Sequence, residues 1–228
     1  MILSDGVDDS AVHDVSPWPA FADLLAATTM LFLILFAVVA LPALVRERAT
    51  SARRTTLTLL QRALSPDTLR GRRYAVDTIG DYLLVRIPEK ATFPKDASSI
   101  ASFQPEGRAI LQEVADKIRS GGLMEEIDQI QVVGHTSSEG DDAYNWQLSA
   151  SRATSVALIL INELQLSACR VTALGRGRFY PVDPSRARQA GHPNPADRRI
   201  ELQIRPVVVG DKLQQEQREH CVETPGPR

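Results

Sequence analysis

Residues 127–164, IDQIQVVGHTSSEGDDAYNWQLSASRATSVALILINEL, decide the fold of this chain. The first ten residues are mainly apolar and β-branched, so they predict a strand. From position 143 the apolar side chains recur at helical spacing instead, which predicts a long helix. Its buried side comprises Ala153, Val156, Ala157, Leu160, Ile161 and Leu164. A strand that leads through a short polar loop into a helix favours an α/β architecture.

The flanking segments extend this pattern in both directions. YAVDTIGDYLLVRI, from Tyr74, predicts two short strands around Gly80. EGRAILQEVADKIRSGG predicts an amphipathic helix that ends at Gly121, and RVTALG and RRIELQI predict two further strands. Since helices alternate with strands, we expect an α/β sandwich over residues 74–209, with helices packed on one face of a mixed sheet. The polar residues 210–228 predict a flexible tail.

An apolar segment near the N-terminus predicts a membrane anchor. Leu24 to Val45 contains no charged residue, and a helix of this length measures about 30 Å, the thickness of a hydrocarbon core. A cleaved signal peptide is disfavoured, because no Lys or Arg precedes Arg46. We therefore expect a transmembrane helix over 21–45, behind a tail of residues 1–20. An arginine-rich amphipathic linker over 46–73 follows.

Two features of this anchor leave questions open. Asp23 is either an N-cap at the membrane interface or an ionisable group inside the membrane, where such groups are functional candidates. The acidic flank before the helix and the basic flank after it, from Arg46 to Arg54, favour a cytoplasmic C-terminal part by the positive-inside rule.

The composition narrows the function. The formal net charge is −2 and aromatic residues make up 5% of the chain, so nothing favours nucleic-acid binding. Cys169 and Cys221 do not have the spacing of a metal site, and they are either free thiols or, in an oxidising compartment, one disulfide. Four scattered histidines and the lack of a nucleophile motif indicate a binding protein, not an enzyme.

Three motifs resemble the OmpA-like peptidoglycan-binding family: ATFPKDASSIASFQPEGRAILQEVADKI, GHTSSEGDDAYNWQLSASRATSV and LGRGRFYPV with NPADRRIELQI. The resemblance implies that the domain binds the peptide stem of peptidoglycan, with Arg152 gripping a stem carboxylate. Ser137 stands where the family has an aspartate, which Glu139 or Asp141 could replace. The expected binding residues are Tyr144, Asn145, Leu148, Arg152, Ser137 and Arg198. Among these, Leu148 could instead be core, Asn145 a helix cap, and Arg198 a surface ion pair.

The segment AFADLLAATTMLFLILF before such a domain resembles MotB-type stator subunits. The resemblance implies that Asp23 carries H⁺ or Na⁺ and that no cofactor is needed. It also implies a bacterial inner-membrane protein with a cytoplasmic N-terminus and a periplasmic domain. The expected partners are peptidoglycan, a second copy of the chain, and a multi-span MotA- or ZorA-like subunit, usually five to two of this chain.

Within this group, the short linker resembles ZorB of the Zorya anti-phage system more than flagellar MotB. It is expected to act as a plug for the ion path. The alternatives are a flagellar MotB-like stator subunit and a passive tether to peptidoglycan without ion flow.

Overall fold

The structure is a computed structural model that describes residues 17–66, 73–183, 193–208, 216 and 221. Most of the predicted N-terminal tail, part of the linker and most of the C-terminal tail lie outside the described residues. The chain divides into two compact units, residues 1–48 and 49–228, and each is considered separately below.

Helix α1 comprises Trp18–Leu64. Its part Trp18–Leu44 is long and apolar enough to cross a membrane by length and composition. Asp23 lies in the second turn of α1, and no acidic residue stands in the first turn. The possibility that Asp23 caps the helix from outside is therefore wrong, because the helix begins five residues earlier.

The last turns of α1 belong to the C-terminal domain. Leu57, Leu60 and Leu64 are at most 3% exposed and form part of its core. The Tyr74 hydroxyl donates to the Leu64 carbonyl at 3.2 Å, and the Thr78 hydroxyl donates to Gln61 at 3.1 Å. The sequence predicts that the domain begins at residue 74, whereas the compact unit begins at Ala49. The apolar stripe of the expected linker packs into the domain that follows it.

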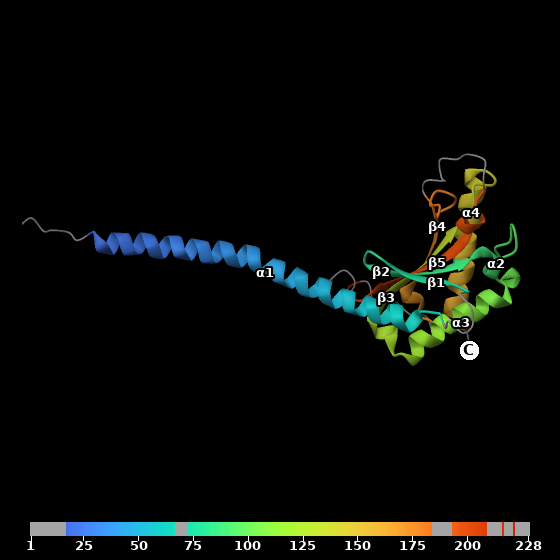
Figure 1. Ribbon diagram of the computed structural model, residues 1–228, viewed down its shortest axis with the longest axis horizontal. Coiled ribbons are helices and arrows are strands. Elements are labelled where there is room, and N and C mark those ends of the chain that lie inside the picture. The colour runs from blue at the N-terminus through green and yellow to red at the C-terminus, as the bar shows by residue number, and fades with distance from the viewer. Residues whose placement is uncertain (1–16, 67–72, 184–192, 209–215, 217–220, 222–228) are drawn as a thin grey trace, which may run out of the picture. The chain divides into compact units, whose positions relative to one another are not determined.

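A five-stranded mixed sheet forms the centre of the domain, in the order β1-β2-β5-β3-β4 (Figure 1). Only β3 and β4 pair in parallel, while the other neighbours are antiparallel. The strands are β1 Ala75–Ile79, β2 Tyr82–Pro88, β3 Ile127–His135, β4 Val171–Gly175 and β5 Arg199–Pro206. Every strand predicted from the sequence is present, and the expected fold class is confirmed.

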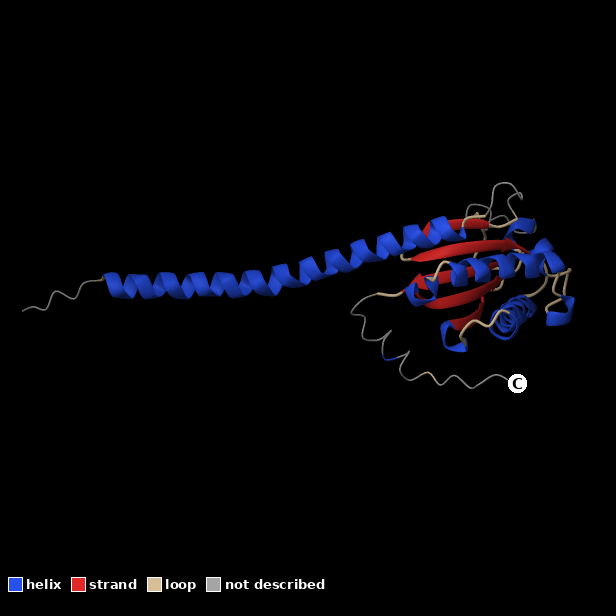
Figure 2. Cartoon of the chain, turned by 90° about the horizontal axis from the view of Figure 1, so that it is seen from below, coloured by secondary structure: helices blue, strands red, loops and turns tan. Residues whose placement is uncertain are grey.

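Helices cover one face of this sheet (Figure 2). They are α3 Pro105–Ser120 and α4 Asp142–Leu158, the latter extended by a π-helical turn Ile159–Glu163. The core lies between alternate residues of the strands, such as Val85 and Leu202, and the apolar sides of these helices. Shorter elements that we had not predicted are α2 Glu89–Thr92 and the 3₁₀ turns Ile100–Ser102, Leu123–Glu126, Ala168–Arg170 and Pro195–Asp197.

Two glycines allow α4 to lie directly against the sheet. A Cβ atom on Gly134 in β3 would come within 2.1 Å of the Ser149 carbonyl oxygen, and one on Gly175 in β4 within 2.6 Å of the Ala150 nitrogen. Only glycine permits such a close backbone approach. This contact fixes the middle of α4 against the ends of β3 and β4.

The face of the sheet opposite the helices carries a buried polar cluster. Arg199 donates from Nε to Glu201 at 2.7 Å, and His135 Nε2 lies 3.3 Å from the other oxygen of Glu201. Burial would raise the pKa of Glu201, but the contacts with His135 and Arg199 outweigh it and lower that pKa to about 2. Burial lowers the pKa of His135. The carboxylate is thus ionised throughout the neutral range.

A disulfide joins Cys169, in the turn before β4, to Cys221. Their Cα atoms are 5.8 Å apart, which is the usual separation for a bridged pair. The sequence allowed either two free thiols or one disulfide, and the structure contains the disulfide.

Candidate functional site

A pocket of about 430 Å³ opens beside the first turns of α4. It is lined by all six residues for which the sequence predicts peptidoglycan binding: Ser137, Tyr144, Asn145, Leu148, Arg152 and Arg198. Six more residues complete its wall: Glu89, Lys95, Asp96, Thr136, Glu139 and Gly140. The expected residues therefore converge on one cavity, although they come from separate parts of the sequence.

The guanidinium of Arg152 is buried and engaged within the protein. Its side chain is 2% exposed and lies 5.5 Å from the centre of the Phe93 ring. Nε donates to the Ala97 carbonyl at 2.8 Å, and Nη2 donates to the Pro94 carbonyl at 3.1 Å. Its remaining nitrogen, Nη1, forms an ion pair with Glu89. Arg152 therefore holds the loop after α2 against α4, in addition to bordering the pocket.

The same loop is attached to α4 by two further hydrogen bonds. The Tyr144 hydroxyl donates to Asp96 at 2.9 Å, and the Ser155 hydroxyl donates to the Ser98 carbonyl at 2.5 Å. The bond to Asp96 raises the pKa of Tyr144. Asp96 has a φ of 59°, in the left-handed region that non-glycine residues rarely adopt. Such strain often accompanies a functional loop, and here it presents Lys95 and Asp96 to the pocket.

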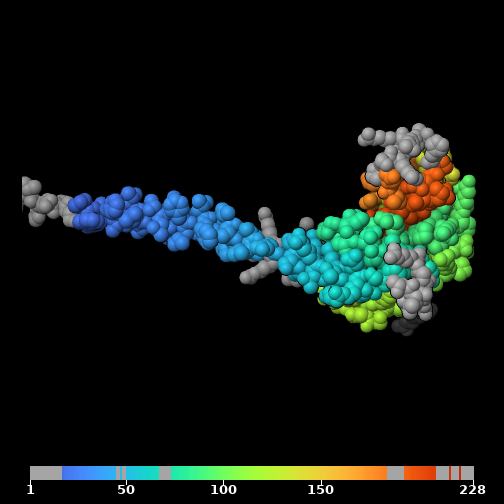
Figure 3. Space-filling model, in the orientation of Figure 1, coloured from blue at the N-terminus to red at the C-terminus, as the bar shows by residue number. Residues whose placement is uncertain are grey.

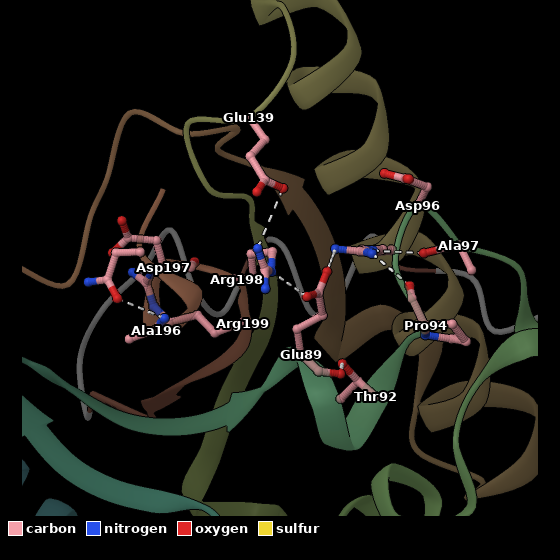
Figure 4. Close-up of polar contacts among 12 residues, drawn as sticks. Glu89, Thr92, Pro94, Asp96, Ala97, Glu139, Ala196, Asp197, Arg198 and Arg199 are labelled. Carbon is pink, nitrogen blue, oxygen red and sulfur yellow. Dashed lines mark hydrogen bonds and ion pairs between the residues drawn. The ribbon is translucent and has the colours of Figure 1, made fainter. Parts of the chain in front are cut away.

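Glu89 links the two arginines of the pocket (Figure 4). One of its oxygens pairs with Arg152, and the other accepts from Arg198 Nε at 2.6 Å. Arg198 also places Nη1 3.6 Å from Glu139. The expected surface ion pair of Arg198 is thus part of a partly buried network.

The loop between β3 and α4 supplies the remaining polar groups. Ser137 is buried, and the buried Thr136 hydroxyl oxygen has no hydrogen-bond partner among the described residues. Asp141 caps α4 by accepting from the Tyr144 amide at 2.7 Å. Asn145 instead donates to the Glu139 carbonyl at 2.7 Å, so the alternative in which Asn145 is the helix cap is wrong. Asp141 does not line the pocket, whereas Glu139 does.

The charges around the pocket are balanced. Three carboxylates, those of Glu89, Asp96 and Glu139, face three cations, those of Lys95, Arg152 and Arg198. Within the described part of the chain, Lys95 has no ion-pair partner. The arrangement suits a ligand that carries a carboxylate and an ammonium group close together.

Sequence reasoning did not select Glu89, Lys95, Asp96 and Thr136. Lys95 and Asp96 lie within the first quoted motif, and Thr136 lies within the second. A positive φ cannot be read from a lysine–aspartate pair, and a single glutamate before that motif resembles a surface residue.

Comparison with known proteins adds the family context. Residues 92–194 match the model of the OmpA family. The lipoprotein YiaD of Escherichia coli is 30% identical over 148 residues, which cover 65% of this chain and 63% of YiaD. The chain thus spans less than two thirds of the length of YiaD, and it spans 50% of outer membrane protein A of Bordetella avium.

Two solved structures have a similar fold. The cell wall anchor of the type VI secretion system from Pseudomonas aeruginosa is 28% identical, with a TM-score of 0.50. The superposed region covers 65% of this chain and 97% of the anchor's chain. A MotB-like protein from Desulfovibrio vulgaris is 21% identical, with a TM-score of 0.53, and covers 72% and 99% respectively. With the family match over residues 92–194, these similarities show that the domain following the apolar part of α1 has an OmpA-like fold.

Proposed function

We propose that this chain is a single-pass inner-membrane subunit of an ion-driven motor complex, which its OmpA-like domain anchors to peptidoglycan. The observation that carries the wall-binding part is the convergence of all six expected residues on one pocket. The similar fold of a cell wall anchor supports it. The apolar part of α1 supports the membrane anchor, and the MotB-like fold of the domain supports the motor role.

In this proposal, the pocket binds the peptide stem of peptidoglycan. Arg198 and Lys95 attract a stem carboxylate. Asp96 and Glu139 attract the ammonium group of the stem, which in the family is held by the aspartate that Ser137 replaces in this chain. Arg152 gives the pocket its shape through the loop that it holds. The domain lies in the periplasm, and the disulfide between Cys169 and Cys221 supports this, since such bonds persist in oxidising compartments.

Asp23 is the proposed ion carrier. It lies in the second turn of α1, within the segment that can cross a membrane. Uptake and release of H⁺ or Na⁺ there changes the charge where α1 meets a multi-span MotA-like partner. We propose two copies of this chain with about five partner subunits, and no cofactor other than the transported ion. The short segment before the domain favours a ZorB-type subunit of the Zorya anti-phage system over flagellar MotB.

We propose that residues 46–64 act as a plug for the ion path, but part of this segment is packed within the domain. Leu57, Leu60 and Leu64 are part of the domain core. A plug formed by this segment would therefore involve its earlier residues, unless the last turns left the domain.

Two measurements test the proposal separately. Sedimentation of the full chain with purified sacculi tests wall binding, and failure of the wild type to sediment would contradict it.

Asp23→Asn tests ion coupling, because the amide keeps the size of the side chain but cannot exchange a proton. The variant should assemble and bind sacculi normally but lose motor function. If it functions as well as wild type does, the chain is a passive tether.

A further inference from the structure

The carboxylate of Glu89 occupies the position between two guanidinium groups that a ligand carboxylate would prefer. One oxygen pairs with Arg152 Nη1, and the other accepts from Arg198 Nε at 2.6 Å (Figure 4). Hydrogen bonds between a guanidinium and a carboxylate are charge-assisted and are stronger than those between neutral groups. The pocket therefore contains an anion of its own.

Among the partners of Arg152, Glu89 is the one that can exchange. The other two partners are the carbonyls of Pro94 and Ala97, and releasing them would free the whole loop. The Glu89 backbone is fixed, because its amide donates to the Arg198 carbonyl at 3.0 Å and its carbonyl accepts from the Phe93 amide at 2.9 Å. Rotation of the Glu89 side chain alone would expose both guanidinium groups.

The balance of charge in the pocket follows from this arrangement. With Glu89 in place, three carboxylates oppose three cations. If the Glu89 side chain turns out of the pocket, the local charge becomes positive and two arginine donors lose their acceptor. Arg152 is buried and would then keep only neutral carbonyl acceptors, so an incoming carboxylate is favoured at its free Nη1.

We propose that Glu89 is an internal competitor, and that an anionic ligand binds this pocket by taking the place of the Glu89 carboxylate between Arg152 and Arg198. The proposal rests on the proposed function only in that the ligand is a carboxylate of the wall peptide. Glu89 thereby lowers the affinity of the pocket for carboxylates. Only a ligand whose carboxylate contacts Arg152 and Arg198 better than the Glu89 carboxylate does will bind.

Glu89→Gln tests the competition directly. The amide keeps the size of the side chain and removes its charge. The full chain, in detergent micelles and labelled with ¹⁵N-arginine, is titrated with sodium acetate at constant ionic strength. The Nε–H signals of Arg152 and Arg198 are followed, and their assignment is confirmed by substitution. We expect half-saturation of the Glu89→Gln variant at a concentration about ten- to hundredfold below that of the wild type.

Glu163→Gln is the matched control. It also removes a carboxylate that pairs with an arginine, Arg108, but Glu163 is exposed and lies outside the pocket. Its half-saturation should stay within about threefold of the wild type, as expected for a surface charge. Equal gains in both variants would indicate a general charge effect and overturn the proposal, as would unchanged acetate binding in Glu89→Gln.

A second readout keeps the test decisive if Glu89→Gln is unstable. Acetate should then raise the thermal midpoint of that variant more than that of the wild type, since a ligand stabilises the state that binds it. Equal shifts would contradict the proposal. Sedimentation with sacculi is scored separately. If acetate behaves as expected but neither protein sediments, the wall-binding function is wrong and the role of Glu89 stands.

Discussion

Leu60 provides a sharp test of where the C-terminal domain begins. Its side chain is 0% exposed and packs in the domain core, whereas the neighbouring Leu59 is 52% exposed. Figure 3 shows the last turns of α1, in cyan, lying against the surface of the domain. Leu60→Ala removes three carbon atoms from the core, which corresponds to about 2.4 kcal/mol of lost burial, and the remaining cavity adds to this cost. We expect a loss of about 2–5 kcal/mol in the free energy of unfolding of the domain.

The assay is urea unfolding of the full chain in detergent micelles. Trp146 fluorescence reports on the domain, with Trp18 replaced by phenylalanine in every protein compared. Leu59→Ala is the matched control and should change the free energy of unfolding by less than about 0.5 kcal/mol. If both substitutions have the same small effect, the last turns of α1 do not belong to the domain core. The domain would then begin near Tyr74, as the sequence alone suggested.

Three further predictions concern the domain. Gly134→Ala should lower the free energy of unfolding by about 1–3 kcal/mol in urea titrations, because the new methyl group would meet the Ser149 carbonyl at 2.1 Å; an unchanged midpoint would contradict the close contact of α4 with the sheet. The pKa of Glu201 is about 2 in the folded protein and 4.5 ordinarily, so its ionisation stabilises the fold above pH 4.5 by an amount on the order of 3 kcal/mol, which is lost as the pH falls toward 2. The stability difference between wild type and Glu201→Gln should therefore shrink over that window, and a constant difference would refute the assignment. Finally, Cys169→Ser opens a loop with a sequence separation of 52 residues and should cost at most about 4 kcal/mol, and thiol labelling of the unreduced, denatured wild type should modify neither cysteine.

The strands could be predicted because the pattern of apolar and polar residues within each segment indicates a strand. In β5, Ile200, Leu202 and Ile204 alternate with polar residues. These apolar side chains do lie in the core, while the polar ones between them are buried on the opposite face. The boundary of the domain was not predictable in this way. The leucines of α1 from Leu57 to Leu64 form an apolar stripe, but a stripe does not reveal which surface it packs against. A linker helix and a core helix therefore have the same pattern.

The candidate site was predictable only in part for a similar reason. Residues on one helix, such as Tyr144, Leu148 and Arg152, can be placed on a common side from their spacing. Glu89 lies in the same pocket because β2 pairs with β5, which places the end of β2 beside the start of β5. There the Glu89 amide donates to the Arg198 carbonyl. A contact between residues so far apart in sequence depends on the order of strands in the sheet, which periodicity does not determine.

The position of β5 has a consequence for how the domain folds. β5 lies between β2 and β3, although it follows both in the chain. Until residue 206 is available, the facing edges of these two strands have no partner, and such edges favour aggregation. Arg198 immediately precedes β5, so the pocket is assembled at the last pairing step. Because the chain is made from its N-terminus, the complete pocket can form only when nearly all of the domain is available.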